Sequence, residues 1–515
     1  RFDVGTAEQT TNENPLTNLF GRIDWQATGS TRVVFRQLWN KAEQFEFSRT
    51  TGTFNASATP GTQFAGFRLG SSSFTRENKN QSSALQLFTN MANGASNEFS
   101  IAYNKISDVR IVPSAAPEIS VNACPVGGAG CPTNAAVTFG TEQFSPDNIL
   151  EQDITEITNN YTMPWGAHTI TFGARFEHAK VFNNFAQRLY GHYLFANIDS
   201  LEAGGALSYS LGYDNGGGIA ADFRTQQYSV YAQDQWDFSR NLRVTFGLRA
   251  DLPRLLDSPA YNDSIQRRAG FNTTVTPKSR VLLSPRVGFN WNPGGEDRNQ
   301  VRGNVGIFTG PPPFIMLGNA FANTGLGLVT LLCSRPDADT RPAPFVINVA
   351  QLPRSCGTSP NPAPGAAGTG GVNITDPDFK YPQNFVTTAG FDRQLPYDVI
   401  FTFEGMYRKA INGLAVVDKN LRGPRLVGGQ PYRDREGRIL YADTIGGTGT
   451  VNNNSQRRIT SIGTPAVSFG EGIIQVTNQS ADYNYTLSAQ LKRRFGEALH
   501  LTAAYTYMQS KDVQS

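Results

Sequence analysis

The sequence is poor in the residues and runs that mark helical membrane proteins and metal enzymes. Among 515 residues there are four Cys, four His and five Met. No stretch approaches the roughly 18 consecutive apolar residues of a membrane-spanning helix. The His residues form no H-x-H or H-E-x-x-H arrangement. These absences exclude a helical membrane protein, and they leave zinc catalysis and a bound cofactor without support.

A dominant sign of charge is also lacking. The chain carries 45 basic and 42 acidic residues, which gives a net charge of +3. So balanced a chain has no general attraction to nucleic acid, and we expect no nucleic-acid partner. A mean hydropathy of −0.35 would by itself suggest a soluble protein. It does not exclude a membrane β-barrel, because only alternate residues of such strands face lipid.

What the sequence has instead is alternation of apolar and polar residues with a period of two. Along 242–251 every second residue from Leu242 is apolar, whereas the intervening ones include Arg243, Arg249 and Asp251. Similar strands joined by short turns are predicted at 19–25 with 33–39, 84–90 with 98–106, 149–162 with 167–178, 228–238 with 242–251, 287–291 with 301–308, 385–393 with 398–408 and 485–495 with 499–508. An eighth pair is expected between 185 and 213, which gives roughly 16 strands.

The connections between these hairpins are long and rich in Gly, Pro, Asn, Ser and Thr. They cover 40–83, 107–148, 252–280, 309–384 and 409–484. Connections longer than about 15 residues are uncommon in compact domains and usually have a functional reason. A regular exchange of short turns and long loops is typical of outer-membrane barrels, with short periplasmic turns and long extracellular loops.

Four of the five Trp residues lie within or beside a predicted short turn: Trp25, Trp165, Trp236 and Trp291. Indole rings favour the boundary between bilayer and water because they have an apolar body and an N–H donor. We therefore interpret these four residues as an aromatic girdle at the periplasmic interface.

The two faces of the predicted strands would then have different surroundings. The apolar face would contact lipid, where an Arg near the midplane costs about 2–4 kcal/mol. The polar face would line a wet or protein-filled lumen. Charges expected on that inner wall, paired with one another or in contact with a plug or a passing ligand, are Arg175, Glu177, Arg243, Arg249, Arg286, Arg302 and Glu404. A soluble β-sandwich also buries one face of each strand, but its strands average about five or six residues, shorter than several predicted here.

Four blocks of sequence resemble TonB-dependent outer-membrane transporters. The stretch YSVYAQDQWDFSRNLRVTFGLRAD (228–251) is similar to the signature Y-x-x-Y-x-Q-D-x-W followed by G-L-R and Asp. The stretches LLSPRVGFNWNP (282–293) with VRGNVGIFTGPPP (301–313), GAHTITFGARFE (166–177) and YTLSAQLKRRFGEALHLTAAYTYMQSKD (485–512) look like segments of the Oar-like branch of that family.

The resemblance implies an all-β fold, a large antiparallel up-and-down transmembrane β-barrel of about 22 strands. In the family a plug closes the barrel, and the periplasmic TonB protein, with its inner-membrane energising complex, opens it. Residues 1–515 would be a partial barrel domain with long extracellular loops, and we expect the plug, the TonB box and the terminal strand to lie outside this chain. The implied function is import of an unidentified extracellular ligand through the bacterial outer membrane, surrounded by outer-membrane lipid and without enzymatic chemistry.

The cysteines form two local pairs in long loops on the same predicted side, Cys124 with Cys131 and Cys333 with Cys356. In an oxidising compartment each pair could close as a disulfide. Closing loops of this size contributes about 2–4 kcal/mol in the chain-entropy account. A metal site is the alternative, but neither a C-x-x-C spacing nor a nearby His supports it.

Three other functions stay open at this point. A passive porin-like or adhesin barrel would need no TonB. An outer-membrane lipase or protease would need a positioned Ser or His, and the sequence has no G-x-S-x-G motif. A soluble extracellular β-sandwich or propeller would show stacked sheets that share an interior.

Overall fold

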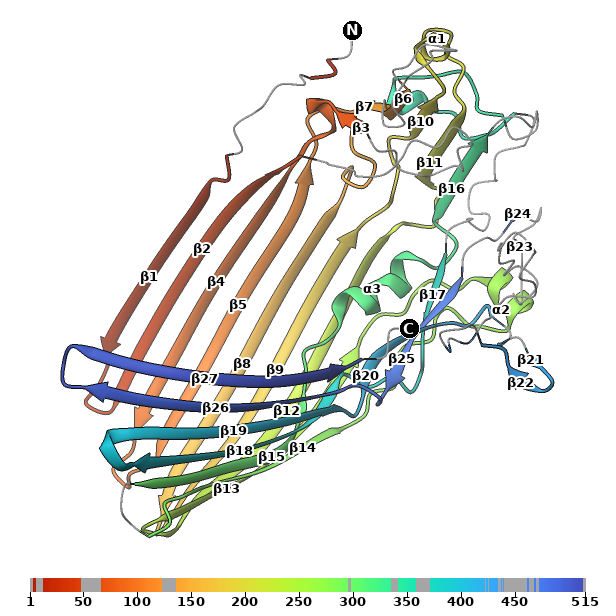
Figure 1. Ribbon diagram of the computed structural model, residues 1–515. Coiled ribbons are helices and arrows are strands. Elements are labelled where there is room, and N and C mark those ends of the chain that lie inside the picture. The colour runs from red at the N-terminus through yellow and green to blue at the C-terminus, as the bar shows by residue number, and fades with distance from the viewer. Residues whose placement is uncertain are drawn as a thin grey trace.

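The structure is a computed structural model that describes residues 3–5, 13–47, 66–122, 136–294, 298–334, 341–357, 371–421 and 472–512, with a few residues between 423 and 468. Nearly half of these residues belong to one large curved sheet, and most of the remainder lie at its long-loop end (Figure 1).

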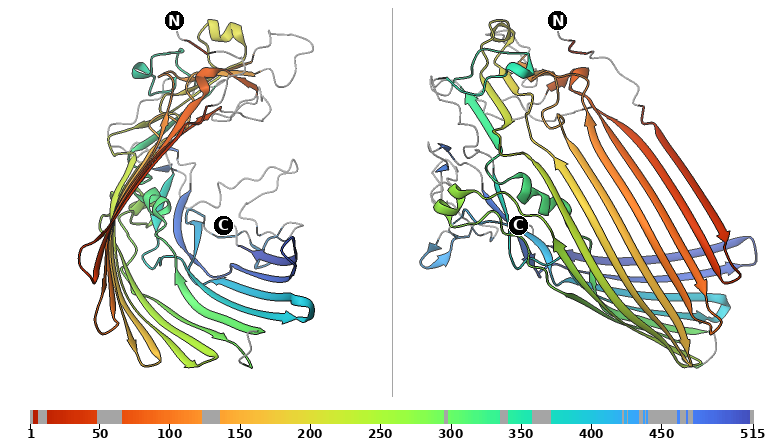
Figure 2. Two further views of the ribbon diagram at one scale, coloured as in Figure 1. Left: turned by 90° about the vertical axis from the view of Figure 1, so that its left-hand side faces the viewer. Right: turned by 180° about the vertical axis from the view of Figure 1, so that it is seen from behind.

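The main sheet has 14 strands, and each is paired antiparallel with the next in sequence order. They are β1 (Leu16–Gln26), β2 (Thr31–Glu46), β4 (Phe74–Asn90), β5 (Ser96–Ile111), β8 (Ile149–Trp165), β9 (His168–Asn184), β12 (Ala220–Ser239), β13 (Leu242–Leu255), β14 (Leu282–Trp291), β15 (Asn299–Thr309), β18 (Gln383–Leu395), β19 (Val399–Ala410), β26 (Tyr483–Phe495) and β27 (Leu499–Lys511). Within the described ranges β1 and β27 are not paired with each other, and the sheet curves into an open trough (Figure 2). The up-and-down antiparallel order predicted from the sequence is confirmed.

Short turns connect the strands of each hairpin at one end of the sheet. In one of the tightest of them Trp165 pairs with His168 across two residues. Gly166 takes a φ of 61° there, which a two-residue hairpin turn requires and glycine adopts without strain. Several strands, such as the 20-residue β12, exceed the 9–11 residues that a tilted strand needs to cross a bilayer. Their surplus length extends toward the long loops.

One face of the sheet presents a continuous apolar surface. Register places one residue from each of eight neighbouring strands in a single row: Ile23, Phe35, Leu85, Ile101, Ile157, Phe176, Tyr228 and Leu252. Large side chains of this row are exposed, Ile23 to 65% and Phe35 to 42%. No second sheet covers this face in the described part of the chain (Figure 2). A stacked sandwich is therefore excluded for this face.

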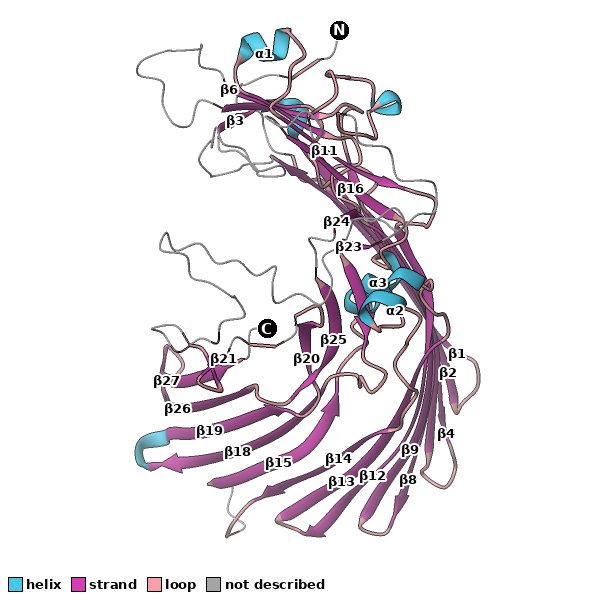
Figure 3. Ribbon diagram, turned by 90° about the vertical axis from the view of Figure 1, so that its right-hand side faces the viewer, coloured by secondary structure: helices cyan, strands magenta, loops and turns pink. Residues whose placement is uncertain are grey.

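The opposite face is the concave one. Helix α3 (Phe314–Ala322) packs on Ala221 and Phe223 of β12 through Gly318, and it lies inside the curve of the sheet (Figure 3). Residues of β12 with odd numbers therefore point into the trough, and those with even numbers point out.

A six-stranded sheet covers the long-loop end of the trough, and we call it the cap sheet. It contains β3 (Gly66–Arg68), β6 (Glu118–Asn122), β7 (Ala136–Phe139), β10 (His192–Phe195), β11 (Ser208–Asp214) and β16 (Leu328–Ser334). Its strands are short and come from loops that are distant in sequence (Figure 1). The long connections are thus folded, and they form a structured cap.

Smaller elements complete the loop region. They are α1 (Ile198–Glu202), α2 (Asp263–Ala269), a three-stranded sheet of β17 (Val372–Thr375), β25 (Ile473–Gln479) and β20 (Gly413–Asp418), and the two-residue pairs β21 (Leu426–Val427) with β22 (Gln430–Pro431) and β23 (Ser461–Ile462) with β24 (Val467–Ser468). The Asn262 side chain caps α2 at its start, and Gly270 ends it in a left-handed conformation. No helix in the described ranges is long and apolar enough to span a membrane.

The predicted count of roughly 16 barrel strands is wrong for the described residues, because the pair expected between 185 and 213 belongs elsewhere. That pair exists as β10 and β11, which run antiparallel to each other inside the cap sheet. Every residue of β10 is buried, so both of its faces are covered by protein. From the sequence alone, a strand that is buried on both faces is not distinguished from a strand whose apolar side faces lipid.

We expect an Arg on the apolar convex face to destabilise the protein far more than an Arg on the adjacent inward position. Ile101→Arg should lower the free energy of unfolding from lipid vesicles by about 2–4 kcal/mol, because its charge would lie in hydrocarbon. Ala102→Arg, one residue along the same strand, points into the trough beside Glu156 and is the matched control. Denaturant titration of both variants measures the difference, and equal losses would contradict the assignment of faces.

Candidate functional site: the inward wall and the loop cap

The seven charges predicted to line the lumen all lie on the concave face. Ladder pairing joins Arg175, Ser229 and Asp251 in one row, and Arg302 and Glu404 flank Gly390 in another. By the same registers Glu177, Arg243, Arg249 and Arg286 share this face. The inward wall therefore gathers guanidinium and carboxylate groups from neighbouring strands of the sheet, among them β8, β9, β13, β14, β15, β18 and β19.

The Arg side chains of the wall are held by hydrogen bonds along the wall. Arg249 donates from Nε to Asp251 at 2.9 Å and from Nη2 to the Ser229 hydroxyl at 3.0 Å. Ser229 and Gln227 also donate to Asp251, at 2.6 and 3.1 Å. Asp251 is only 1% exposed, and these donors compensate its burial.

Two further arginines bridge pairs of acids. Arg175 pairs with Glu156 and Glu177, and Arg302 pairs with Asp392 and Glu404. Arginine suits this role because its planar fork offers several donors at fixed directions. The wall is therefore a polar surface on which partly exposed arginine and carboxylate side chains are joined by ion pairs.

Glycines on neighbouring strands create the space in which some of these side chains lie flat. A Cβ on Gly247 would approach Arg286 Nε to 2.8 Å, and one on Gly306 would approach Arg286 Cβ to 2.9 Å. A Cβ on Gly390 would likewise meet Arg302 Nε at 2.9 Å. Contacts that close are not tolerated, so an Ala at Gly247 or Gly390 would displace the outer part of the Arg side chain from the sheet.

The wall also has a hollow of about 600 Å³ beside Arg302. Arg243, Arg302 and Glu404 line it together with neutral polar residues that charge alone did not single out, among them Asn290, Asn304, Thr388 and Ser488. Each of the four has the strand parity of the inward charges, and that parity is the signal in the sequence that would have found them.

The four Trp residues predicted as a girdle lie on the convex face near the short turns, and Trp25, Trp165 and Trp291 are exposed to 61%, 68% and 45%. The Trp236 ring stacks on His168 with centroids 5.3 Å apart. His168 Nδ1 lies 2.7 Å from Asp234 Oδ2, which gives this outward carboxylate a partner.

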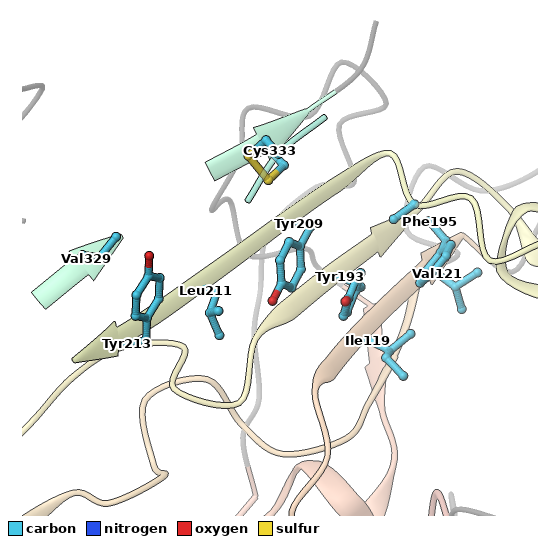
Figure 4. Close-up of a cluster of buried hydrophobic side chains, with 11 residues drawn as sticks. Ile119, Val121, Tyr193, Phe195, Tyr209, Leu211, Tyr213, Val329 and Cys333 are labelled. Carbon is cyan, nitrogen blue, oxygen red and sulfur yellow. A yellow bond between two sulfur atoms is a disulfide. The ribbon is translucent and has the colours of Figure 1, made fainter. Parts of the chain in front are cut away.

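Above the wall, the cap sheet encloses an aromatic core on one of its faces. Tyr193 and Tyr209 stack with centroids 4.3 Å apart, and Phe345 packs edge-on against Tyr193 at 5.0 Å. Figure 4 shows these Tyr rings beside Phe195 and Cys333. Burial raises the pKa of Tyr193 to about 12, as expected for a phenol in apolar surroundings.

A disulfide between Cys333 of β16 and Cys356 ties the segment 341–357 to this core, with Cα atoms 5.4 Å apart. This predicted pair is therefore present. Cys124 and Cys131, the other predicted pair, lie outside the described residues. Because Phe345 and Leu352 pack on the core from the same segment, the disulfide fastens the cover of the core in place.

The other face of the cap sheet buries a polar cluster. Arg68 Nη1 donates to Glu118 Oε1 at 2.7 Å, and the Ser120 hydroxyl lies 3.3 Å from His192 Nε2. Burial lowers the pKa of His192 to about 3 and raises the pKa of Glu118. The imidazole is therefore neutral in the folded cap.

This cluster does not have the geometry of a hydrolase. The His192 ring presents the same nitrogen, Nε2, to Ser120 and to Glu118, which lies 3.8 Å away. A Ser–His–acid triad requires the acid on the other ring nitrogen. All three side chains are at most 4% exposed, so a substrate does not reach them.

A comparison with known protein families shows which family this chain belongs to. A family model described as "outer membrane beta barrel domain" matches residues 4–515. The chain belongs to this family. Its place is accordingly the bacterial outer membrane, and the apolar convex face is the surface that meets lipid.

Several solved structures are similar to this chain. The outer membrane transporter YddB from Escherichia coli is similar, with 14% identity, a TM-score of 0.55, and coverage of 98% of this chain and 49% of that one. The siderophore receptor PirA from Acinetobacter baumannii has 13% identity, a TM-score of 0.49 and coverage of 98% and 54%. A mutant of the ferric enterobactin receptor PfeA from Pseudomonas aeruginosa has 10% identity, a TM-score of 0.48 and coverage of 96% and 51%. The chain thus spans about half the length of these structures, and no curated protein matches it.

Loss of the disulfide should loosen the cap without unfolding the sheet below it. In a Cys333→Ser, Cys356→Ser double variant we expect local stability of the cap to fall by about 2–4 kcal/mol, in proportion to the loop that is no longer closed. Limited proteolysis within 341–357 measures the change, with detergent-resistant β-sheet content as the control. Cleavage at the wild-type rate would contradict the role of the disulfide.

The cap should also lose stability in acid because of His192. Its folded pKa of about 3 lies below the ordinary 6.5, so the unfolded state binds the proton first as the pH falls. The stabilisation is complete above pH 6.5 and decreases below it, by about 1–2 kcal/mol between pH 7 and pH 5. Glu118 acts in the opposite direction, because its raised pKa makes the folded cap the tighter proton binder.

Hydrogen exchange of cap amides at the two pH values tests this account. His192→Gln should abolish most of the loss between pH 7 and pH 5, whereas His500→Gln, an exposed residue at the far end of β27, should leave it unchanged. A loss of the same size in the His192 variant would show that another group titrates.

Proposed function

We propose that this chain is the barrel portion of a TonB-dependent outer-membrane transporter, which binds an extracellular ligand with its long loops and imports it without covalent chemistry. The observation that carries the proposal is the combination of a polar, Arg-rich inward wall with a folded cap over its extracellular end. TonB enters through the resemblance of residues 228–251 to the family signature, and the plug and TonB box would belong to the rest of the full-length protein.

The chemistry of the wall supports passage or docking of a polar partner. Hydroxyl, amide and guanidinium groups line the hollow of about 600 Å³, and Glu404 is exposed along with them. The charges are mutually paired, so a partner that moves along the wall can exchange one hydrogen bond for another without leaving a bare charge. The long loops that form the large cap add an expectation of a sizeable ligand.

Conductance separates this proposal from a passive porin. The full-length protein in a planar bilayer should show no steady ion current, because a transporter of this kind stays closed until TonB acts. A persistent open current would favour the porin-like alternative and overturn the proposal.

Uptake can be tested while the ligand is still unidentified. Mass spectrometry of the medium compares which small molecules are depleted by cells that express the full-length protein, in parental and in TonB-deficient hosts. We expect depletion of at least one compound that requires TonB, and a reduction of several-fold when Arg302→Gln disturbs the wall. Lys409→Gln, an outward-facing control, should deplete the medium like the wild type. Depletion that is indifferent to TonB would contradict energised import.

A further inference from the structure

The aromatic core of the cap lies beneath a single layer of chain, residues 341–357, which we call the strap. Apart from the short 3-10 turn Val349–Gln351, the strap has no regular secondary structure. Its outer side chains are open to solvent, Ile347 to 42%, whereas Phe345 and Leu352 pack on the core. The strap therefore separates the core from the surface.

Beneath the strap, aromatic residues of β10 and β11 form a continuous platform, which consists of Tyr193, Phe195, Tyr209 and Tyr213. Figure 4 shows the three tyrosine rings in a row along the two strands. All four side chains are at most 6% exposed. The platform is therefore closed to ligands while the strap lies on it.

The strap contacts the platform in the way that a bound peptide would. The Phe345 ring packs edge-on against Tyr193 and Phe195, with centroids 5.0 and 5.6 Å apart. The Arg354 guanidinium lies over the Tyr213 ring, 4.8 Å from its centroid, in a cation–π contact. One aromatic side chain and one cation of the strap thus occupy two separate positions on the platform.

The fit of the strap to the platform is incomplete. The Tyr209 hydroxyl donates to the Pro353 carbonyl at 3.0 Å. The Tyr213 hydroxyl has no hydrogen-bond partner among the described residues, and a buried hydroxyl without a partner is unfavourable. Within the same ranges a single backbone hydrogen bond joins the strap to the rest of the cap, from Phe345 N to Gly204 O at 3.1 Å. An occupant that offers Tyr213 an acceptor would therefore compete with the strap.

The disulfide between Cys333 and Cys356 holds the C-terminal end of the strap. The strap therefore stays attached to the cap when its middle part leaves the platform, and it can return. A tethered competitor has a high local concentration, so it lowers the apparent affinity of the platform for an external ligand.

We propose that the platform is a peptide-binding site, which the strap occupies as an internal pseudo-ligand until an external peptide displaces it. The peptide is extended and carries an aromatic residue for Tyr193 and an Arg or Lys for Tyr213. These positions are roughly 14 Å apart, because Tyr193 pairs with Tyr209, four residues from Tyr213. The inference rests on the proposed import function, for which it names a class of ligand, but capture of the peptide needs no TonB.

A fluorescent synthetic peptide with the sequence of residues 342–355 is the probe, and anisotropy measures its affinity for the full-length protein in detergent. Phe345→Ala with Arg354→Ala loosens the strap and leaves the platform intact, so this variant should bind the probe about tenfold more tightly than the wild type. Gln351→Ala, at an exposed position of the strap, is the matched control and should bind like the wild type. A peptide of scrambled sequence should bind none of the three proteins.

A double-mutant cycle locates the peptide on the platform. In the loosened protein, replacing the Arg of the probe by Gln should weaken binding several-fold. The same replacement should have no effect once Tyr213→Leu has removed the ring beneath it. In the wild type, saturating probe should speed proteolysis within 341–357, because the displaced strap becomes accessible. Detergent-resistant sheet content and hydrogen exchange of β10 and β11 show that each variant is folded.

Equal affinity of the loosened and wild-type proteins, binding of the scrambled peptide, or additive losses in the cycle would each overturn the proposal. Proteolysis of the strap that the probe slows or leaves unchanged would do the same. The assay contains no TonB, so its failure leaves TonB-dependent uptake intact, and a failure of uptake does not alter the measured affinity.

Discussion

Hydrocarbon covers one face of this sheet, and most of the architecture follows from that constraint. A backbone N–H or C=O left unpaired in lipid costs several kcal/mol, so strands that cross a bilayer must be bonded to neighbours along their length. The interior strands of the main sheet satisfy this condition through unbroken antiparallel ladders. Residues that face outward must then be apolar, and polar residues are confined to the alternate positions, which face inward.

The inward face shows how a wall rich in charge remains stable. Its arginines lie along the sheet over glycines of the adjacent strands, as Arg286 does over Gly247. The same glycines leave the lumen open, because side chains that lie flat do not fill it. A stable wall and an open lumen thus result from one arrangement of residues, and the outward face beside it remains free to contact lipid.

Much of the sheet could be predicted from the sequence because lipid imposes a strict period of two. The pairing of 228–238 with 242–251 is found as expected, with Val230 opposite Ala250. The cap could not be predicted in this way. Tyr193 of β10 packs on Tyr209, and also on Phe345 from a segment more than a hundred residues away. The inward-facing residues of β12 also change from polar to apolar at Phe223, because α3 packs there. Both features depend on contacts between distant segments, which local alternation does not contain.

The central claim is that the convex face contacts hydrocarbon while the concave face contacts water. Single spin labels placed at each position from 97 to 104 of β5, in the full-length protein reconstituted into vesicles, test it most directly. Collisional accessibility to oxygen should peak at the odd positions, such as Phe99 and Ile101. Accessibility to a water-soluble nickel complex should be higher at the even ones. A pattern without the period of two, or with the parities reversed, would contradict the account.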